Sequence, residues 1–213
     1  MPTVAAFDFD GTLTRRDTFT SFLACGLGWP RFLLALLQCL PWLAGYALRL
    51  IGNDEAKARL MLATLSGRTT AEMEVWTTRW LNQAFPGQLQ DWTLARLVYH
   101  QQAGHCCVLV SASPDIYLPR VASQLGFDGL ICTEMEVQQD GEGGRLTGRM
   151  RTPNCYGAQK VLRLNAWLSE RFGAESLGSM TLYAYGDTAG DKPMLRLAQH
   201  AWYQGQPWKD REL

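Results

Sequence analysis

The chain has 213 residues, enough to bury one sizeable core and to carry an inserted segment. Its 20 basic and 20 acidic residues balance and form no charged tail, which excludes the usual electrostatic footprint of a nucleic-acid-binding protein. Neither a P-loop nor a G-x-G-x-x-G motif is present, so the common signatures of nucleotide binding are also missing.

The cysteines and the first apolar run indicate the compartment. The six cysteines contain no C-x-x-C pair, and the three histidines lack the spacing of zinc ligands. We therefore expect free thiols in a reducing environment. Asp8 and Asp10 interrupt the first apolar run, so we expect no secretory signal and a cytoplasmic location.

The apolar run at residues 4–9 predicts a buried strand that leads into a pair of acidic residues, Asp8 and Asp10. These lie two positions apart, so an extended backbone would point both side chains to one side. Carboxylates this close repel each other unless a cation or an acid–base role favours them. The pair indicates a divalent metal, a carboxylate nucleophile or both, and a solvated turn is the alternative.

After the first strand, residues 15–96 have helical spacing without strong strand signals, which predicts a helical insertion. Amphipathic helices are expected at residues 55–65 and 71–84. Asp17 falls near the start of this insertion, where a helix N-terminal role is one reading.

The most unusual part of the insertion is the apolar run WPRFLLALLQCLPWLAGYALRLI at residues 29–51. Pro41 is expected to divide it into two helical pieces of about eleven residues, too short to cross a hydrocarbon core of about 30 Å. We expect a hairpin in peripheral contact with the membrane, or else a buried part of the insertion or a contact with a protein. The residues expected at a membrane surface are Trp29, Trp42, Arg31, Arg49, Lys57 and Arg59.

Further strands are predicted at residues 106–110 and 181–185, with shorter ones at 129–132 and 201–203. Strands that alternate with helices predict an α/β fold with a Rossmann-like, mostly parallel sheet that has helices on both faces. Ligands bind beyond the carboxyl ends of such strands. Residues 135–150 alternate around Asp-Gly and Gly-Gly turns, which predicts a β-hairpin.

Polar residues follow the strands at this edge of the sheet. Ser111 precedes Pro114, which suits a first helical turn, so its hydroxyl and the nearby N–H groups are expected to hold an anion or only to cap a helix. Lys160 falls in the first turn of a helix predicted from residue 156 to residue 172, where a surface lysine is the alternative. Asp187 and Asp191 share a loop, and further carboxylates beside the first pair would be costly without a cation.

Four motifs in this order resemble those of the haloacid dehalogenase superfamily of phosphohydrolases: DFDGTLT, LVSAS, the GxxK of residues 157–160 and GDTAGDKPM. The insertion, the hairpin and the last motif look most like the phosphoserine-phosphatase-like branch, and a bacterial subgroup that includes phosphatidylglycerophosphatase C is similar. The resemblance implies a catalytic core at residues 1–14 and 97–213, and an inserted all-helical cap at residues 15–96 that selects the substrate. It also implies hydrolysis of a phosphomonoester with Mg²⁺ through an aspartyl-phosphate.

The resemblance implies a role for each motif residue. Asp8 is the nucleophile, and Asp10 protonates the leaving oxygen, with its pKa raised by the nearby Asp8 charge. Mg²⁺ is held by the Asp8 carboxylate, the main-chain carbonyl of Asp10 and Asp187. The remaining residues bind the phosphoryl group (Ser111, Ala112, Lys160), support the site (Gly11, Thr12, Asp191) or occupy the position where amino-acid-specific relatives usually carry a Glu that contacts the substrate (Asp17).

The physiological substrate stays open. A lipid or glycerol-type phosphate at the inner face of the cytoplasmic membrane and a soluble, phosphoserine-like metabolite are both expected partners. A phosphotransferase is a further alternative, and a membrane-associated binding protein with an inactive fold is the non-enzymatic one. The complete motifs argue against the last alternative, and the oligomeric state is not indicated.

Overall fold

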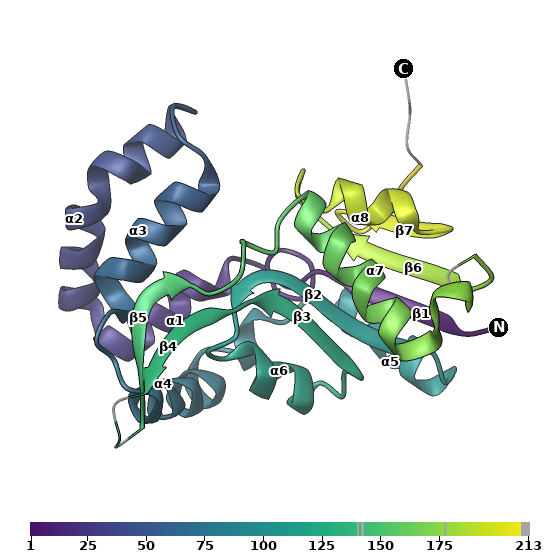
Figure 1. The fold of residues 1–213 in the computed structure, drawn as a ribbon, viewed down its shortest axis with the longest axis horizontal. Coiled ribbons are helices and arrows are strands. Elements are labelled where there is room, and N and C mark those ends of the chain that lie inside the picture. The colour runs from purple at the N-terminus through teal and green to yellow at the C-terminus, as the bar shows by residue number, and fades with distance from the viewer. Residues whose placement is uncertain (140, 142, 177, 210–213) are drawn as a thin grey trace.

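Six strands form the central sheet of the protein, whose computed structural model describes residues 1–139, 141, 143–176 and 178–209 (Figure 1). The first five strands are parallel, and only β8 runs antiparallel to its neighbour. This confirms the predicted α/β fold. In spatial order the strands are β3 (Gly129–Thr133), β2 (Cys106–Pro114), β1 (Thr3–Phe7), β6 (Thr181–Gly186), β7 (His200–Tyr203) and β8 (Gln206–Pro207).

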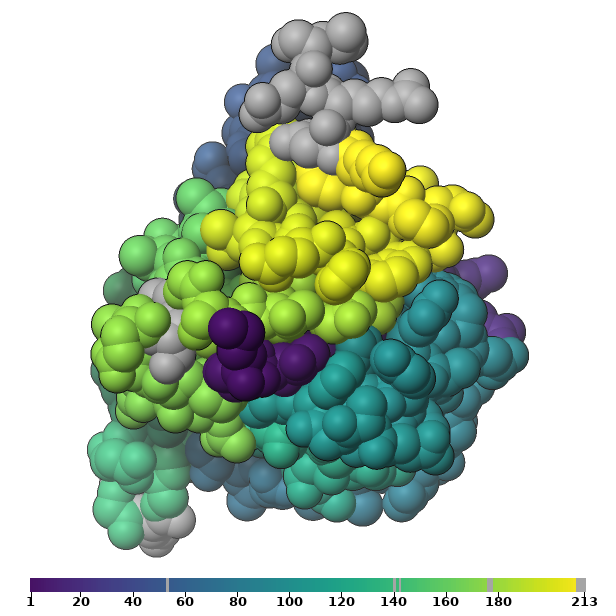
Figure 2. Space-filling view, turned by 90° about the vertical axis from the view of Figure 1, so that its right-hand side faces the viewer, coloured from purple at the N-terminus to yellow at the C-terminus, as the bar shows by residue number. Residues whose placement is uncertain are grey.

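Helices cover both faces of this sheet because its central strands are apolar on both sides. Along β1, Val4 and Ala6 belong to one buried cluster, and Ala5 and Phe7 belong to another. The first cluster contains side chains of α7 (Ala158–Phe172) and α8 (Lys192–Leu197), and the second contains side chains of α5 (Asp91–Gln102) and α6 (Leu118–Gln124). Figure 2 shows the end of the molecule where the first residues emerge between α5 and the C-terminal strands.

Residues 15–96, called the inserted segment below, are mostly helical. Their helices are α1 (Thr18–Leu27), α2 (Trp29–Ala47), α3 (Asn53–Leu65), α4 (Thr70–Gln83) and the short 3-10 helix η1 (Pro86–Gln88). The helix α5 begins at Asp91, so the boundary predicted after residue 96 falls inside it. In Figure 1, α2 and α3 lie side by side at one end of the molecule.

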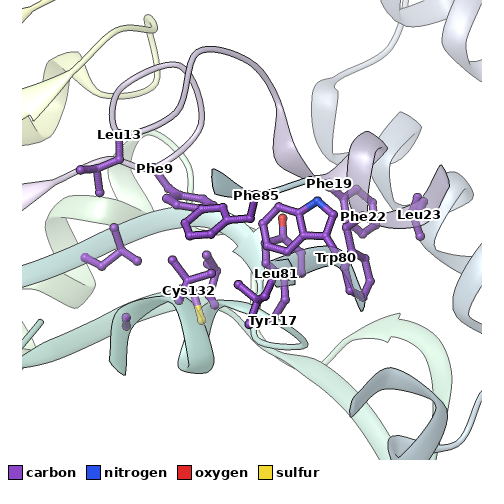
Figure 3. Packing of buried hydrophobic residues seen from close by; sticks show 14 of the residues in the cluster. Phe9, Leu13, Phe19, Phe22, Leu23, Trp80, Leu81, Phe85, Tyr117 and Cys132 are labelled. Atoms are coloured by element: carbon purple, nitrogen blue, oxygen red, sulfur yellow. The ribbon is translucent and has the colours of Figure 1, made fainter. Parts of the chain in front are cut away.

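Aromatic packing joins the inserted segment to the sheet (Figure 3). Phe22 of α1 and Trp80 of α4 pack against Tyr117, with ring centroids 4.8 Å and 5.0 Å away. Trp80 also contacts Phe85, which lies next to Phe9 at the end of β1. All five rings are buried, so this cluster fixes the base of the inserted segment beside the predicted acid pair.

The division of residues 29–51 at Pro41 is wrong. The helix α2 continues through Pro41 as a single helix of 19 residues. Proline removes one hydrogen bond and strains the preceding turn, which is costly where the freed carbonyl is buried. The freed carbonyl belongs to Leu37, and Leu37 and Pro41 are both exposed, so this turn of the helix faces water and the helix continues. No helix of the described residues is long and apolar enough to span a membrane.

The predicted hairpin is present as β4 (Met135–Gln139) and β5 (Gly144–Met150), although residues 140 and 142 of its turn lie outside the described residues. It leaves the core and contacts the inserted segment. Gly67 N donates to Leu146 O at 2.9 Å, and Leu146 N donates to Arg68 O at 2.8 Å. Gly148 has φ +79°, and a Cβ there would lie 2.9 Å from Leu62 Cα on α3. The hairpin therefore supports α3 through a contact that a side chain would block.

We expect Gly148→Ala to lower the free energy of unfolding by about 2 kcal/mol more than Gly104→Ala. Both positions have positive φ, but a Cβ at Gly104 meets nothing within 4 Å. Urea unfolding of the two variants isolates the contact with α3. Equal losses of stability would show that the close approach of Gly148 to Leu62 is unimportant.

Candidate active site

The predicted site residues meet at one edge of the sheet. In the parallel register, Phe7 of β1 pairs with Leu109 of β2 and with Tyr185 of β6. The residues that follow these strands therefore lie next to one another. A cavity of about 280 Å³ opens at this edge, between the sheet and the inserted segment.

A buried ammonium lies at the centre of this cavity wall. Lys160 Nζ donates to Asp8 Oδ1 at 2.5 Å, to Asp191 Oδ1 at 2.6 Å and to Val110 O at 2.9 Å. Lys160 is 1% exposed, so it is not the surface lysine that was the alternative. Burial alone would lower its pKa, but the charges of Asp8 and Asp191 raise it above the ordinary value. Asp191 is likewise buried, and the Lys160 charge holds its pKa below the usual range.

Three carboxylates gather beside this ammonium. Asp8, Asp187 and Asp191 each offer an oxygen, and these oxygens lie within 4.8 Å of one another. The Thr12 hydroxyl lies 3.1 Å from Asp8 Oδ2 and 2.9 Å from Asp187 Oδ1. Burial raises the pKa of Asp8 well above its ordinary value, with the Asp191 charge adding to the effect, and burial also raises the pKa of Asp187.

These donors suit a hard divalent cation. Three negative charges around one ammonium leave negative charge that a cation would neutralise, and carboxylate oxygens are the ligands such a cation prefers. A Cβ at Gly11 would lie 2.1 Å from Asp187 Oδ2, and Gly11 has φ +84°. Glycine at this position therefore lets the Asp187 carboxylate approach the first motif.

Asp10 lines the same cavity but hydrogen-bonds to a different set of groups. Its Oδ1 accepts hydrogen bonds from Thr18 N and Thr18 Oγ1, both at 2.6 Å, and its Oδ2 accepts one from Ser113 Oγ at 2.5 Å. The strand β1 ends at Phe7, so the alternation of a strand does not extend to Asp10, but both Asp8 and Asp10 line the cavity. The main-chain carbonyl of Asp10 remains the group predicted to face a cation.

Burial raises the pKa of Asp10 to about 6, and the Asp17 charge contributes in the same direction. The predicted direction of this shift is therefore right, but its main cause is burial rather than the charge of Asp8. A carboxyl group with this pKa can both give and accept a proton near neutral pH.

The phosphate-binding prediction falls on a β-bulge in β2. The ladder pairs Ser111 with Cys132 and next pairs Pro114 with Thr133, so Ala112 and Ser113 bulge out. Ser113 N donates to Ser111 Oγ at 3.0 Å, which leaves the Ser111 hydroxyl proton available to an anion. The predicted helix start at Pro114 is wrong, because β2 continues to Pro114 and α6 begins at Leu118. The bulge, rather than a helix N-terminus, presents these groups.

Asp17 caps α1 and also lines the cavity. It is the N-cap residue, and its Oδ1 accepts a hydrogen bond from Thr20 N at 2.9 Å. This is the helix N-terminal role that the sequence left open. Because the side chain also borders the cavity, a contact with substrate stays a prediction.

Part of the cavity wall is apolar or aromatic. Its lining includes Phe19, Leu43, Tyr46, Leu60 and Tyr156. Tyr156 packs against Gly190, where a Cβ would lie 2.1 Å from the Tyr156 ring. The polar end near Asp8 and this apolar wall suit a ligand with an anionic head and a less polar body.

Sequence reasoning missed three polar residues around this site: Thr18, Ser113 and Lys57. The Ser-x-Ser spacing in LVSAS was a usable signal for Ser113. Lys57 was predicted to face membrane headgroups, but its ammonium reaches Ala112 O and Asn154 Oδ1, the latter at 3.0 Å. Its position three residues before the buried Leu60 was a signal that it faces inward.

The sequence model of the family of haloacid dehalogenase-like hydrolases matches residues 5–196 of this chain. The chain belongs to this family. It is 34% identical over 203 residues to the protein CicA of Caulobacter vibrioides. This alignment covers 95% of this chain and 86% of CicA. It is 26% identical to a histidinol-phosphatase of Neisseria meningitidis, with 92% of this chain and 87% of that protein covered.

Several solved structures share the fold of this chain. A protein of unknown function from Bordetella pertussis superposes with a TM-score of 0.79 at 23% identity, covering 94% of this chain and 89% of that one. Phosphoserine phosphatase in its apo form superposes with a TM-score of 0.63 at 17% identity, covering 95% and 86%. The predicted family and its phosphoserine-phosphatase-like fold are confirmed.

We expect Lys160→Met to lower the free energy of unfolding by about 3 kcal/mol in metal-free buffer at pH 8, because it leaves two buried carboxylates without their cation. Urea unfolding measures the loss. Adding Asp191→Asn to this variant removes one of the stranded charges and should restore part of the stability. A double variant no more stable than Lys160→Met would contradict this account of the ion pairs.

Proposed function

We propose that this protein is a Mg²⁺-dependent phosphatase that hydrolyses a phosphomonoester through an aspartyl-phosphate on Asp8. The observation that carries the proposal is the buried Lys160 ammonium between Asp8 and Asp191, with the Asp187 carboxylate beside them. Residues 1–14 and 97–213 would form the catalytic core, and the inserted segment would form the cap. The name of the histidinol-phosphatase relative supports a phosphomonoester as substrate.

Each residue has a defined task in this mechanism. An Asp8 oxygen attacks phosphorus while Asp10 gives a proton to the departing alkoxide oxygen. Asp10 then takes a proton from a water molecule, which attacks the phosphorus of the aspartyl-phosphate and releases inorganic phosphate and free Asp8. Lys160 and the Ser111 hydroxyl hold the equatorial oxygens, with the N–H of Ala112 beside them.

The cation would be held by Asp8, Asp187 and the main-chain carbonyl of Asp10, with Asp191 and Thr12 supporting the site. When bound, Mg²⁺ supplies positive charge that offsets the repulsion between a carboxylate nucleophile and a phosphate dianion. The raised pKa values of Asp8 and Asp187 support this assignment, because each indicates a carboxylate whose negative charge lacks full compensation.

The mechanism is tested by phosphate release from phosphoserine, histidinol phosphate, sugar phosphates and phosphatidylglycerol phosphate. We expect Mg²⁺-dependent release that stops in EDTA and falls at least about 10³-fold in Asp8→Asn, since the nucleophile is lost. Glu136→Gln, on the exposed side of β4, is the matched control. Full activity in EDTA or in Asp8→Asn would overturn the mechanism. Transfer of phosphate to an added alcohol would identify a phosphotransferase.

Metal binding has an independent readout. In EDTA, Asp187→Asn should unfold at a temperature equal to or above that of the wild type, because it removes one of the clustered negative charges. Added Mg²⁺ should raise the melting temperature of the wild type and leave that of the variant unchanged. A Mg²⁺-induced rise of the same size in both proteins would place the cation elsewhere.

A second observation favours a lipid or glycerol-type phosphate at a membrane surface. The helix α2 exposes a row of large apolar side chains, among them Trp29 (66% exposed), Leu37 (65%) and Leu40 (56%). Residues 28–52 contain no acidic residue, whereas Arg31 and Arg49 lie near the two ends of the row. An apolar face flanked by cations complements an anionic lipid bilayer, and Leu43 and Tyr46 of the same helix line the cavity. The proposed location of this contact is the inner face of the cytoplasmic membrane.

We expect the protein to co-sediment with vesicles that contain phosphatidylglycerol and not with neutral phosphatidylcholine vesicles. Leu37→Glu should reduce binding at least about tenfold, because it places a charge in the apolar row. Val98→Glu, an equally simple change at an exposed residue of α5, should have no effect. Absence of wild-type binding, or self-association through α2 instead, would count against the membrane contact.

A further inference from the structure

Lys57 connects the inserted segment to the bulge of β2. It lies on α3, yet its Nζ donates to the main-chain carbonyl of Ala112 and to Asn154 Oδ1. Asn154 in turn donates to Asp54 Oδ1 at 2.6 Å, on the same helix. The helix therefore contacts the core at two points one turn apart, through a buried asparagine.

The peptide group between Ala112 and Ser113 is held on both sides. Its carbonyl accepts hydrogen bonds from Lys57 Nζ and, at 2.7 Å, from Thr133 Oγ1. Its N–H donates to Ser111 Oγ at 3.0 Å. The Ser113 hydroxyl donates to Asp10 Oδ2 at 2.5 Å. The orientation of this single peptide thus sets the positions of both hydroxyls, one facing the predicted phosphate site and one facing Asp10.

The surroundings of Lys57 act on its charge in opposite directions. Burial lowers the pKa of Lys57 to about 8, although several neighbouring groups act in the opposite direction. These are Asp54 on its own helix, Asp10 and Asp17 around the start of α1, and the Cys155 thiol before α7. A half-buried lysine whose ammonium is turned inward is favoured only where that ammonium makes specific hydrogen bonds.

We propose that Lys57 is a positioning residue that, by holding the Ala112–Ser113 peptide, aligns Ser113 with Asp10 for proton transfer to the leaving group. The inference rests on the proposed function, because it assigns a task within that mechanism. Its consequence is that the acid–base apparatus is complete only when α3 lies against the core. The inserted segment then takes part in the chemistry as well as enclosing the substrate.

The test exploits the need of the leaving group for a proton. An alkyl phosphate such as glycerol phosphate requires protonation of its leaving oxygen, whereas p-nitrophenolate leaves without it. In Lys57→Met we expect kcat/KM for the alkyl ester to fall at least about tenfold further than kcat/KM for p-nitrophenyl phosphate. The control is Glu55→Gln, which removes an exposed charge from the same helix and should change neither value.

A pH profile gives a second readout. Lys57 is charged below its pKa near 8, so wild-type kcat/KM for the alkyl ester should fall as the pH rises through 8. That decline should be absent in Lys57→Met. If Lys57→Met does not fold, as judged by thermal unfolding, Asp54→Ala is the second variant, because Asp54 is exposed and accepts the hydrogen bond of Asn154, the partner of Lys57. It should show the same dependence on the leaving group with a smaller loss.

The proposal is overturned if both esters lose activity equally, or if Lys57→Met changes only KM for substrates that carry a second anionic group. The first outcome would indicate a general structural role and the second a direct contact with substrate. Failure of the proposed function looks different, because it would appear in the wild-type enzyme as activity in EDTA or as full activity of Asp8→Asn.

Discussion

The interaction on which the site depends is the ammonium of Lys160, buried between Asp8 and Asp191. Three elements far apart in the sequence supply its partners: the end of β1, the carbonyl of Val110 in β2 and the loop after β6. A buried lysine is unfavourable unless its charge is compensated, so these elements must adopt one relative arrangement. The parallel register of β2, β1 and β6 delivers it, since their carboxyl ends fall at the same level.

Two side chains of the site, those of Asp187 and Tyr156, lie directly against the backbone of a glycine. Gly11 lets the Asp187 carboxylate reach the first motif, and Gly190 lets the ring of Tyr156 pack beside the cavity. A Cβ at either position would overlap its neighbour at 2.1 Å, a separation that real side chains do not show. Both positions need a residue without a Cβ, and Gly11 also needs one that tolerates a positive φ.

The sequence predicted the elements whose signals are local. Apolar runs located the strands of the sheet, and the polar residues directly after them located Asp8, Ser111 and Asp187. Predictions failed where long-range packing decides the outcome. Whether Pro41 ends a helix depends on the exposure of one carbonyl, and whether Lys57 faces membrane or core depends on where α3 is held by the hairpin. The raised pKa of Asp10 shows the same limit, since its main cause is burial, which depends on the folded surroundings.

The hairpin and the bulge together explain how an inserted segment can influence a site built on the sheet. β5 contacts α3 through the backbone of Leu146 and the bare Cα of Gly148, so the helix has little freedom to move along the hairpin. From that fixed helix, Lys57 donates to the carbonyl of Ala112, in the part of β2 that departs from the regular ladder. In the bulge, the Ala112 carbonyl accepts hydrogen bonds from two side chains, Thr133 of β3 and Lys57 of α3. The bulge frees it to accept a hydrogen bond from outside the sheet, and this freedom lets the inserted segment contribute to the arrangement of Asp10.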